Sequence, residues 1–115
     1  MKTTQQLGEL VALHLAQPLK VRDVVFVSLN RGSNDYARNL FEYLFRDHVE
    51  VTKDFVKFNG DALVVYFTTV ERYPSDFIGR CDHIVIDHYV HEVGGRMYPS
   101  WVASMDILNG RRNAK

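Results

Sequence analysis

The sequence predicts one α/β domain, a layered sheet of about four strands that includes an Asn-Gly hairpin, with about three helices. Two short apolar runs without alternation, residues 24–29 and 84–87, are typical of strands covered on both faces. Apolar residues recur with a helical period within residues 7–15 and 37–45. The dipeptide Asn59-Gly60 between two β-rich runs predicts the hairpin.

The first helix is expected over residues 3–17. Thr3 or Thr4 is a good N-cap, and Pro18 ends the segment. One face carries residues at helical spacing: Leu7, Leu10, Val11, His14 and Leu15. On such a face a histidine is more often buried and hydrogen-bonded than a ligand, so we expect His14 to belong to the core.

A strand over residues 24–29 is followed by the polar cluster 30–34, which reads as a turn ending in N-cap residue types. The next helix is the clearest of the chain. Its apolar face comprises Ala37, Leu40, Phe41, Leu44 and Phe45.

The hairpin strands are expected over residues 49–58 and 61–70, with Leu63, Val65 and Phe67 on one face of the second. Residues 71–80 read as a loop. A last helix begins at Ser100 and has one apolar face, formed by Trp101, Met105 and Leu108. We therefore expect a single domain over residues 1–110 and a basic C-terminal tail over residues 111–115.

Composition excludes several classes of protein. Apolar residues make up 46% of the chain and charged residues 24%, which is typical of a globular domain. The sequence has no apolar run long enough to span a bilayer and no secretory signal pattern. The single cysteine, Cys81, excludes an internal disulfide framework, so a cytoplasmic setting is expected.

The net charge of zero hides an uneven distribution. Residues 1–46 carry six basic and four acidic side chains, and residues 47–92 carry four basic and nine acidic ones. Residues 93–115 carry four basic side chains and one acidic. Basic ends around an acidic middle can mark a partner surface or simply a solvated surface of mixed sign.

Several strings together resemble the core of P-loop NTPases, in particular helicases and phage terminase ATPases. Lys2-Thr3-Thr4 before a helix is similar to the end of a Walker A motif, and residues 25–44 look like the following strand and helix. Residues 81–88 end in Asp87-His88 and resemble a Walker B strand, with the Gly79-Arg80 loop before it. The resemblance spans residues 2–92.

Two departures from that pattern predict a truncated, catalytically degenerate relative. Because Met1 directly precedes Lys2, we expect the glycine-rich loop that cradles phosphates and its preceding strand to be missing. His88 stands where the family places the acid that activates water. Asp87 keeps the first acidic position, where the family holds Mg²⁺. We therefore expect a protein that is not an enzyme and needs no cofactor.

Nucleic-acid binding has diffuse support in the sequence. Polar residues follow a central strand, where α/β sheets place ligands, and the C-terminal segment is basic. The candidate contacts are Arg31, Ser33, Asn34, Arg96, Arg111, Arg112 and Lys115. Seven aromatic side chains offer stacking faces if they are exposed: Tyr36, Tyr43, Tyr66, Tyr73, Tyr89, Tyr98 and Trp101. The alternative is that Tyr43 and Trp101 pack on helix faces.

Two further chemistries have weaker support. The cluster Cys81, His83, His88 and His91 contains metal-ligand types, but its spacing suits a strand poorly. His88 and His91 can converge only if the chain turns helical after Asp87. Catalysis by the Cys81 thiolate lacks a positive environment, because Asp82 is its neighbour. We expect no metal site.

The leading expectation is a small, phage-type accessory or regulatory protein that binds nucleic acid, most directly single-stranded DNA, or a nucleic-acid-processing protein. One alternative is a protein-interaction module or inhibitor that uses the acids of the hairpin region: Glu50, Asp54, Asp61, Glu71 and Asp76. Another is a nucleotide-binding subunit completed by a partner chain through Asp87 and Mg²⁺. The edge strands of a small sheet favour a homo-oligomer.

Overall fold

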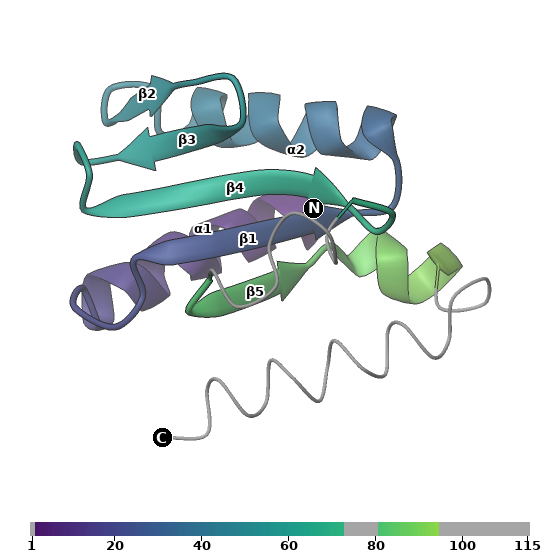
Figure 1. Cartoon of the computed structure of the whole chain (residues 1–115), viewed down its shortest axis with the longest axis horizontal. Coiled ribbons are helices and arrows are strands. Elements are labelled where there is room, and N and C mark those ends of the chain that lie inside the picture. The colour runs from purple at the N-terminus through teal and green to yellow at the C-terminus, as the bar shows by residue number, and fades with distance from the viewer. Residues whose placement is uncertain (1, 73–80, 95–115) are drawn as a thin grey trace.

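A computed structural model describes residues 2–72 and 81–94 of the chain. Five strands form one mixed sheet in the order β2-β3-β4-β1-β5 (Figure 1). The strands are β1 (Asp23–Ser28), β2 (Val49–Val51), β3 (Phe55–Phe58), β4 (Leu63–Thr69) and β5 (His83–Ile86). The helical segments are α1 (Lys2–Ala16), α2 (Arg31–Leu44) and the π-helical turn η1 (Val90–Gly94). The predicted α/β class is confirmed.

The centre of the sheet is parallel and buried on both faces. β1 pairs in parallel with β4 on one side and with β5 on the other, whereas β3 runs antiparallel to both β2 and β4. The side chains of residues 24–27 are all fully buried. This double coverage explains the run of apolar residues without alternation in β1.

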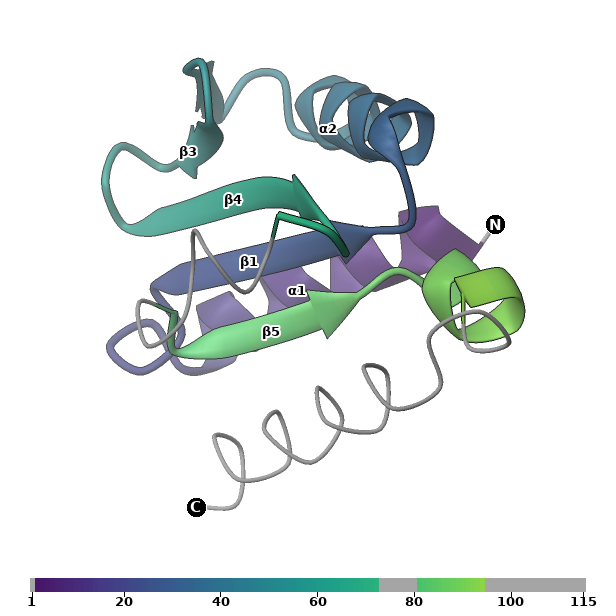
Figure 2. The ribbon, with the colours of Figure 1, turned by 45° about the vertical axis from the view of Figure 1, so that its right-hand side comes forward.

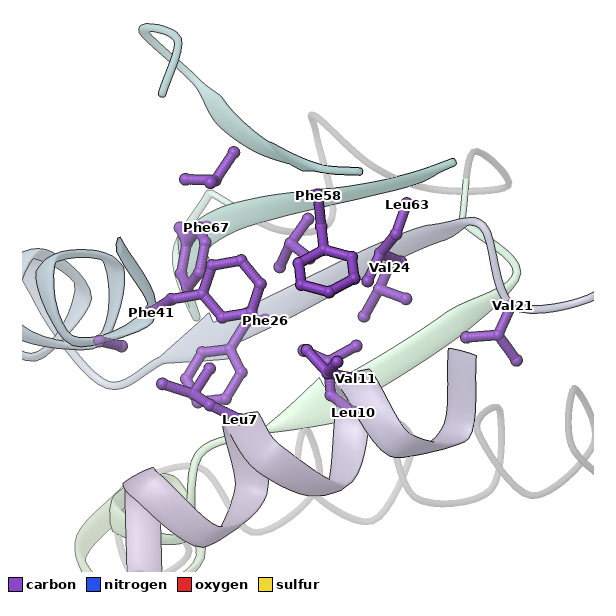
Figure 3. Packing of buried hydrophobic residues seen from close by; sticks show 13 residues of the cluster. Leu7, Leu10, Val11, Val21, Val24, Phe26, Phe41, Phe58, Leu63 and Phe67 are labelled. Carbon is purple, nitrogen blue, oxygen red and sulfur yellow. The ribbon is translucent and has the colours of Figure 1, made fainter. Parts of the chain in front are cut away.

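Two apolar clusters lie on the two faces of β1. Both α1 and α2 pack on one face, where Leu7 and Phe41 meet Phe26 (Figure 3). The predicted apolar face of β4, Leu63, Val65 and Phe67, belongs to this cluster. The opposite cluster joins β1 and β5 to η1 and comprises Val25, Val27, Val70, Cys81, Ile84, Ile86 and Val90.

His14 is a core residue, as predicted. It is buried, its Nδ1 lies 2.6 Å from the carbonyl oxygen of Val21, and its ring meets Phe58 edge-on. The paired ring nitrogen removes the cost of burying a polar group, so this histidine is satisfied within the fold.

The turn between β3 and β4 has the backbone conformation that its sequence requires. Asn59 and Gly60 have φ angles of 52° and 68°, in the left-handed region that these two residue types tolerate. Phe58 pairs with Leu63 across this turn, which confirms the predicted hairpin.

The expected first hairpin strand, residues 49–58, is wrong as one element because it folds back on itself. Thr52 Oγ1 donates to the carbonyl oxygen of Phe55 over 2.8 Å and accepts from its N–H over 3.3 Å. These bonds close a tight turn, so β2 and β3 pair antiparallel and the sheet has five strands.

The two long helices begin at the edge of the sheet where the parallel strands end (Figure 2). We call this the carboxyl edge: it gathers the ends of β1, β4 and β5 with the first turns of α1 and α2. The expected last helix, the basic tail and most of the loop at residues 71–80 lie outside the described residues. Among the described residues, no helix is long and apolar enough to cross a membrane.

Candidate functional site

A buried polar cluster joins the first turn of α1 to the end of β5. Thr3 Oγ1 donates to Asp87 Oδ1 over 3.0 Å, and the two side chains are only 6% and 3% exposed. His88 Nδ1 lies 3.0 Å from the same carboxylate oxygen and 3.3 Å from Thr3 Oγ1. The fold thus brings together Lys2-Thr3 and Asp87-His88, two of the strings that carry the sequence resemblance.

The side chain of Gln6 holds the backbone on both sides of Asp87. Its Nε2 donates to the carbonyl oxygen of Ile86 over 2.7 Å, and its Oε1 accepts from the N–H of His88 over 3.0 Å. The Gln6 carboxamide therefore forms, at the end of β5, the two backbone hydrogen bonds that a neighbouring strand would form there. On the other side, the N–H of Asp87 donates to the carbonyl oxygen of Val27 over 2.9 Å.

Lys2 forms an ion pair at the rim of this cluster. Its ammonium group donates to the Glu92 carboxylate, which belongs to η1. This hydrogen bond lowers the pKa of Glu92, and the charges of Lys2 and His88 add to the lowering. Both side chains of the pair are largely exposed, so the ion pair lies in contact with solvent.

A cavity of about 290 Å³ opens between the first turns of α1 and α2. It is lined by Lys2, Thr3, Ser33, Tyr36, Asp87, His88 and Tyr89, and we call it the tyrosine cavity. Tyr36 and Tyr89 are 49% and 47% exposed, so each presents part of a ring to solvent. The cavity combines aromatic surface with hydroxyl groups and an ammonium group.

The predicted site residues Arg31, Ser33 and Asn34 lie in the first turn of α2, and the expected turn over residues 30–34 is therefore wrong. The physical reason is the cap: Asn30 Oδ1 accepts from the N–H of Ser33 over 2.9 Å and from its hydroxyl over 3.0 Å. Because Asn30 is the N-cap, α2 begins four residues earlier than it would with Asn34 as the cap.

Arg31 and Asn34 line a second cavity of about 730 Å³, which we call the charged cavity. Its other wall contains the turn between β2 and β3. The Arg38 guanidinium group fixes that turn by donating to the carbonyl oxygens of Thr52 and Lys53. The carboxyl edge therefore carries two cavities, with the first turn of α2 contributing to both.

The remaining predicted contacts fall elsewhere. Arg96, Arg111, Arg112 and Lys115 lie outside the described residues, as does Asp76 of the acidic set. Within that set, Asp61 and Glu71 flank opposite ends of β4, and Asp61 forms an ion pair of 3.0 Å with Lys57.

The Cys81 and histidine cluster is spread along β5 rather than gathered. Cys81 is buried before the strand begins, and His88 follows its far end. The chain does turn helical after Asp87, yet His88 lines the tyrosine cavity and His91 lines a groove beside β5. The described residues contain no group of three or more side chains placed to hold a metal ion.

Comparison of the chain with protein-family models, curated proteins and solved structures found no match.

Proposed function

We propose that this chain is a small, non-enzymatic accessory protein of the phage type that binds nucleic acid, most directly single-stranded DNA, in the tyrosine cavity. One observation carries the proposal: two half-exposed tyrosine rings line the same cavity as the Lys2 ammonium group and Ser33. Aromatic rings that stack on bases, next to groups that bind phosphate, are the common elements of single-strand binding sites.

The carboxyl edge also suits phosphate electrostatically. The first turns of α1 and α2 both contribute to the tyrosine cavity, and helix N-termini carry partial positive charge and N–H groups that favour anions. The buried Asp87 carboxylate would repel phosphate. It accepts a hydrogen bond from the Thr3 hydroxyl and contacts His88, and these contacts reduce that repulsion. Lys2 is the group we assign to the phosphate, because the hydroxyl and the N–H of Ser33 already donate to Asn30.

We propose a P-loop origin for this site, because Thr3 and Asp87 belong to the two strings that resemble Walker motifs and form a hydrogen bond with each other. His88, in place of a second acid, supports a binding role rather than catalysis. The same contact favours one second candidate, a nucleotide-binding subunit completed by a partner chain.

In that second candidate Thr3 and Asp87 would hold Mg²⁺, since hydroxyl and carboxylate oxygens are its preferred ligands. The ion would neutralise phosphate charge when bound. Calorimetry with ATP and Mg²⁺ tests this candidate: a titration with no heat of binding removes it, and an Asp87→Asn variant should abolish any heat observed.

The main proposal is tested by fluorescence anisotropy with a labelled single-stranded oligonucleotide over a salt series. We expect saturable binding that weakens with salt, because phosphate contacts release counterions. Tyr36→Ala and Tyr89→Ala should each weaken binding by about fivefold to a hundredfold, as the loss of one stacked base does.

The matched control is Tyr43→Ala, which removes a tyrosine that is 70% exposed on the same helix but is not among the residues lining the cavity. Its affinity should stay within about twofold of the wild type. The absence of saturable binding at low salt, or an equal loss in the Tyr43 variant, would refute the proposal.

Failure of DNA binding would leave the protein-interaction alternative. It predicts that neutralising Glu50, Asp54 and Glu71 abolishes binding to a nucleic-acid-processing protein, whereas neutralising Arg111, Arg112 and Lys115 does not.

We also propose that the protein acts in the cytoplasm as a homo-oligomer, supported by the exposed side chain of Val51 on the edge strand β2. Light scattering after gel filtration measures the mass directly.

A further inference from the structure

The contacts of His88 fix which of its ring nitrogens carries the hydrogen. Its Nδ1 lies 3.0 Å from Asp87 Oδ1 and 3.3 Å from Thr3 Oγ1. The Thr3 hydroxyl already donates to the Asp87 carboxylate, so both oxygens next to Nδ1 can only accept a hydrogen bond from it. In the neutral imidazole the hydrogen therefore lies on Nδ1, and Nε2 carries a lone pair.

Nε2 is the ring nitrogen that is left for a ligand. Within residues 2–72 and 81–94, Nε2 forms no hydrogen bond, and it is not one of the fully buried side-chain atoms without a partner. The His88 side chain is 26% exposed and lines the tyrosine cavity. Nε2 is therefore an accessible acceptor on a side chain of that cavity, and it suits a ligand group that donates a hydrogen bond.

This acceptor lies near the group that we assign to the phosphate. Lys2 and His88 both line the cavity, and Thr3, the next residue after Lys2, contacts the His88 ring. In a nucleotide the sugar hydroxyl groups adjoin the phosphate, whereas the donors of the base lie beyond the sugar, and the base is the part that stacks on tyrosine. A sugar hydroxyl is therefore the donor that matches Nε2.

Single-stranded DNA carries a free sugar hydroxyl only at its ends, because every internal 3′ oxygen is bonded to phosphate. The cavity of about 290 Å³ is at the lower limit of small-molecule sites, so it has room for one nucleotide rather than for a longer stretch. Both features suit the end of a strand.

We propose that the tyrosine cavity binds the 3′-terminal nucleotide of single-stranded DNA, whose free 3′ hydroxyl donates a hydrogen bond to His88 Nε2. This inference rests on the proposed function. The terminal base stacks on Tyr36 or Tyr89, and the phosphate of the same nucleotide binds Lys2.

The experiment compares two oligonucleotides of one sequence, one ending in a 3′ hydroxyl and the other in a 3′-deoxy sugar. A fluorescent label on the 5′ end removes the 5′ hydroxyl, so the strands differ in one donor alone. We expect the 3′-hydroxyl strand to bind about twofold to tenfold more tightly, as one hydrogen bond allows. A circular strand of the same sequence should compete no better than the 3′-deoxy strand.

Substitution of His88 locates the acceptor. His88→Phe keeps an aromatic ring but has no ring nitrogen, so it should bind both strands with affinities within about twofold of each other. The matched control is His91→Phe, since His91 belongs to η1 and lines the groove beside β5 instead of the tyrosine cavity. This control should keep the preference for the 3′ hydroxyl, and thermal unfolding checks that both variants are folded.

The tautomer is measured independently in the unsubstituted protein. Nitrogen chemical shifts of the His88 imidazole at neutral pH should show a protonated Nδ1 and an unprotonated Nε2. A hydrogen on Nε2 would overturn the inference, because an N–H group cannot accept from a hydroxyl.

Equal affinities for the 3′-hydroxyl and 3′-deoxy strands, while Tyr36→Ala still weakens binding, would overturn the recognition of strand ends and leave the proposed function standing. A preference that persists in His88→Phe would overturn the role of His88. If no oligonucleotide binds, both the inference and the proposed function are wrong.

Discussion

Glu92 forms an ion pair with Lys2, whose ammonium group we assign to the phosphate. The Glu92 carboxylate pairs with the Lys2 ammonium group at the rim of the tyrosine cavity. A bound phosphate would therefore compete with Glu92 for the same ammonium group. Exposed ion pairs are weak, so a ligand phosphate can displace Glu92. If the cavity binds phosphate as we propose, Glu92 affects the affinity without contacting the ligand.

Replacing Glu92 by Gln should tighten oligonucleotide binding by up to about fivefold, because it frees Lys2 and removes one negative charge. Protonation of Glu92 in the wild type has the same effect. Its lowered pKa delays that effect to pH values below the usual carboxyl range, so the advantage of the variant should vanish there.

Anisotropy at neutral and acidic pH measures both effects. The control is Glu9→Gln, which removes one exposed acid from α1 outside the tyrosine cavity. A weaker Glu92→Gln variant would show that the carboxylate positions Lys2 instead of competing for it.

The conformation and burial of single residues could be predicted best where they depend on neighbouring residues alone. The left-handed turn at Asn59-Gly60 follows from two residue types, and the burial of His14 follows from its place on an apolar helix face. The contact of Thr3 with Asp87 has no local signal, because 84 residues separate the partners. It depends on the parallel pairing of β5 with β1, which places the end of β5 beside the start of α1.

Elements were predictable in type and less so in their boundaries. The cap at Asn30 and the turn at Thr52 both depend on side-chain oxygens that bond to nearby backbone groups. Several residues of each polar cluster could do this, so the sequence leaves the start of α2 and the break between β2 and β3 open. Gln6 had no signal at all, because its partners belong to β5 and its end.

Gln6→Ala tests how α1 holds the edge strand. Removing the carboxamide leaves the carbonyl oxygen of Ile86 and the N–H of His88 without these bonds. We expect a loss of about 1–3 kcal/mol in the free energy of unfolding, measured by urea denaturation. DNA binding should weaken too, since His88 and Tyr89 follow the released segment.

Gln5→Ala is the matched control for that experiment. Within residues 2–72 and 81–94, its carboxamide donates only to the exposed Glu9 on the same helix, so stability should change by less than about 0.5 kcal/mol. Equal stability of the two variants would mean that the contact of Gln6 with β5 contributes nothing to holding the strand.

At the scale of the whole molecule, the sequence predicts the α/β class because β1 is apolar on both faces and helical periods surround it. The strand order β2-β3-β4-β1-β5 could not be predicted, since several pairings bury the same apolar surface. That order positions the candidate site: it places β1 between β4 and β5, and the first turn of α2 lines both the tyrosine cavity and the charged cavity.

The net charge of zero does not show where the charged side chains lie, and the fold places several of them together. The carboxyl edge gathers Lys2, Arg31 and Lys53 with Asp35 and Asp54, so it is mixed in sign rather than uniformly basic. If this edge binds nucleic acid as we propose, it does so through a few phosphate contacts, so we expect a shallow salt dependence. A short contact with few phosphates fits this arrangement better than a long basic groove.

We propose that the carboxyl edge binds single-stranded nucleic acid, and chemical-shift mapping can locate that binding residue by residue. Backbone amide signals of the labelled protein would be followed during titration with a short single-stranded DNA oligonucleotide. We predict saturable shifts at Ser33, Asn34, Tyr36 and His88, with little change at Leu19 and Asp61 on the opposite edge. Shifts confined to Leu19 and Asp61, or none at the carboxyl edge, would contradict the account.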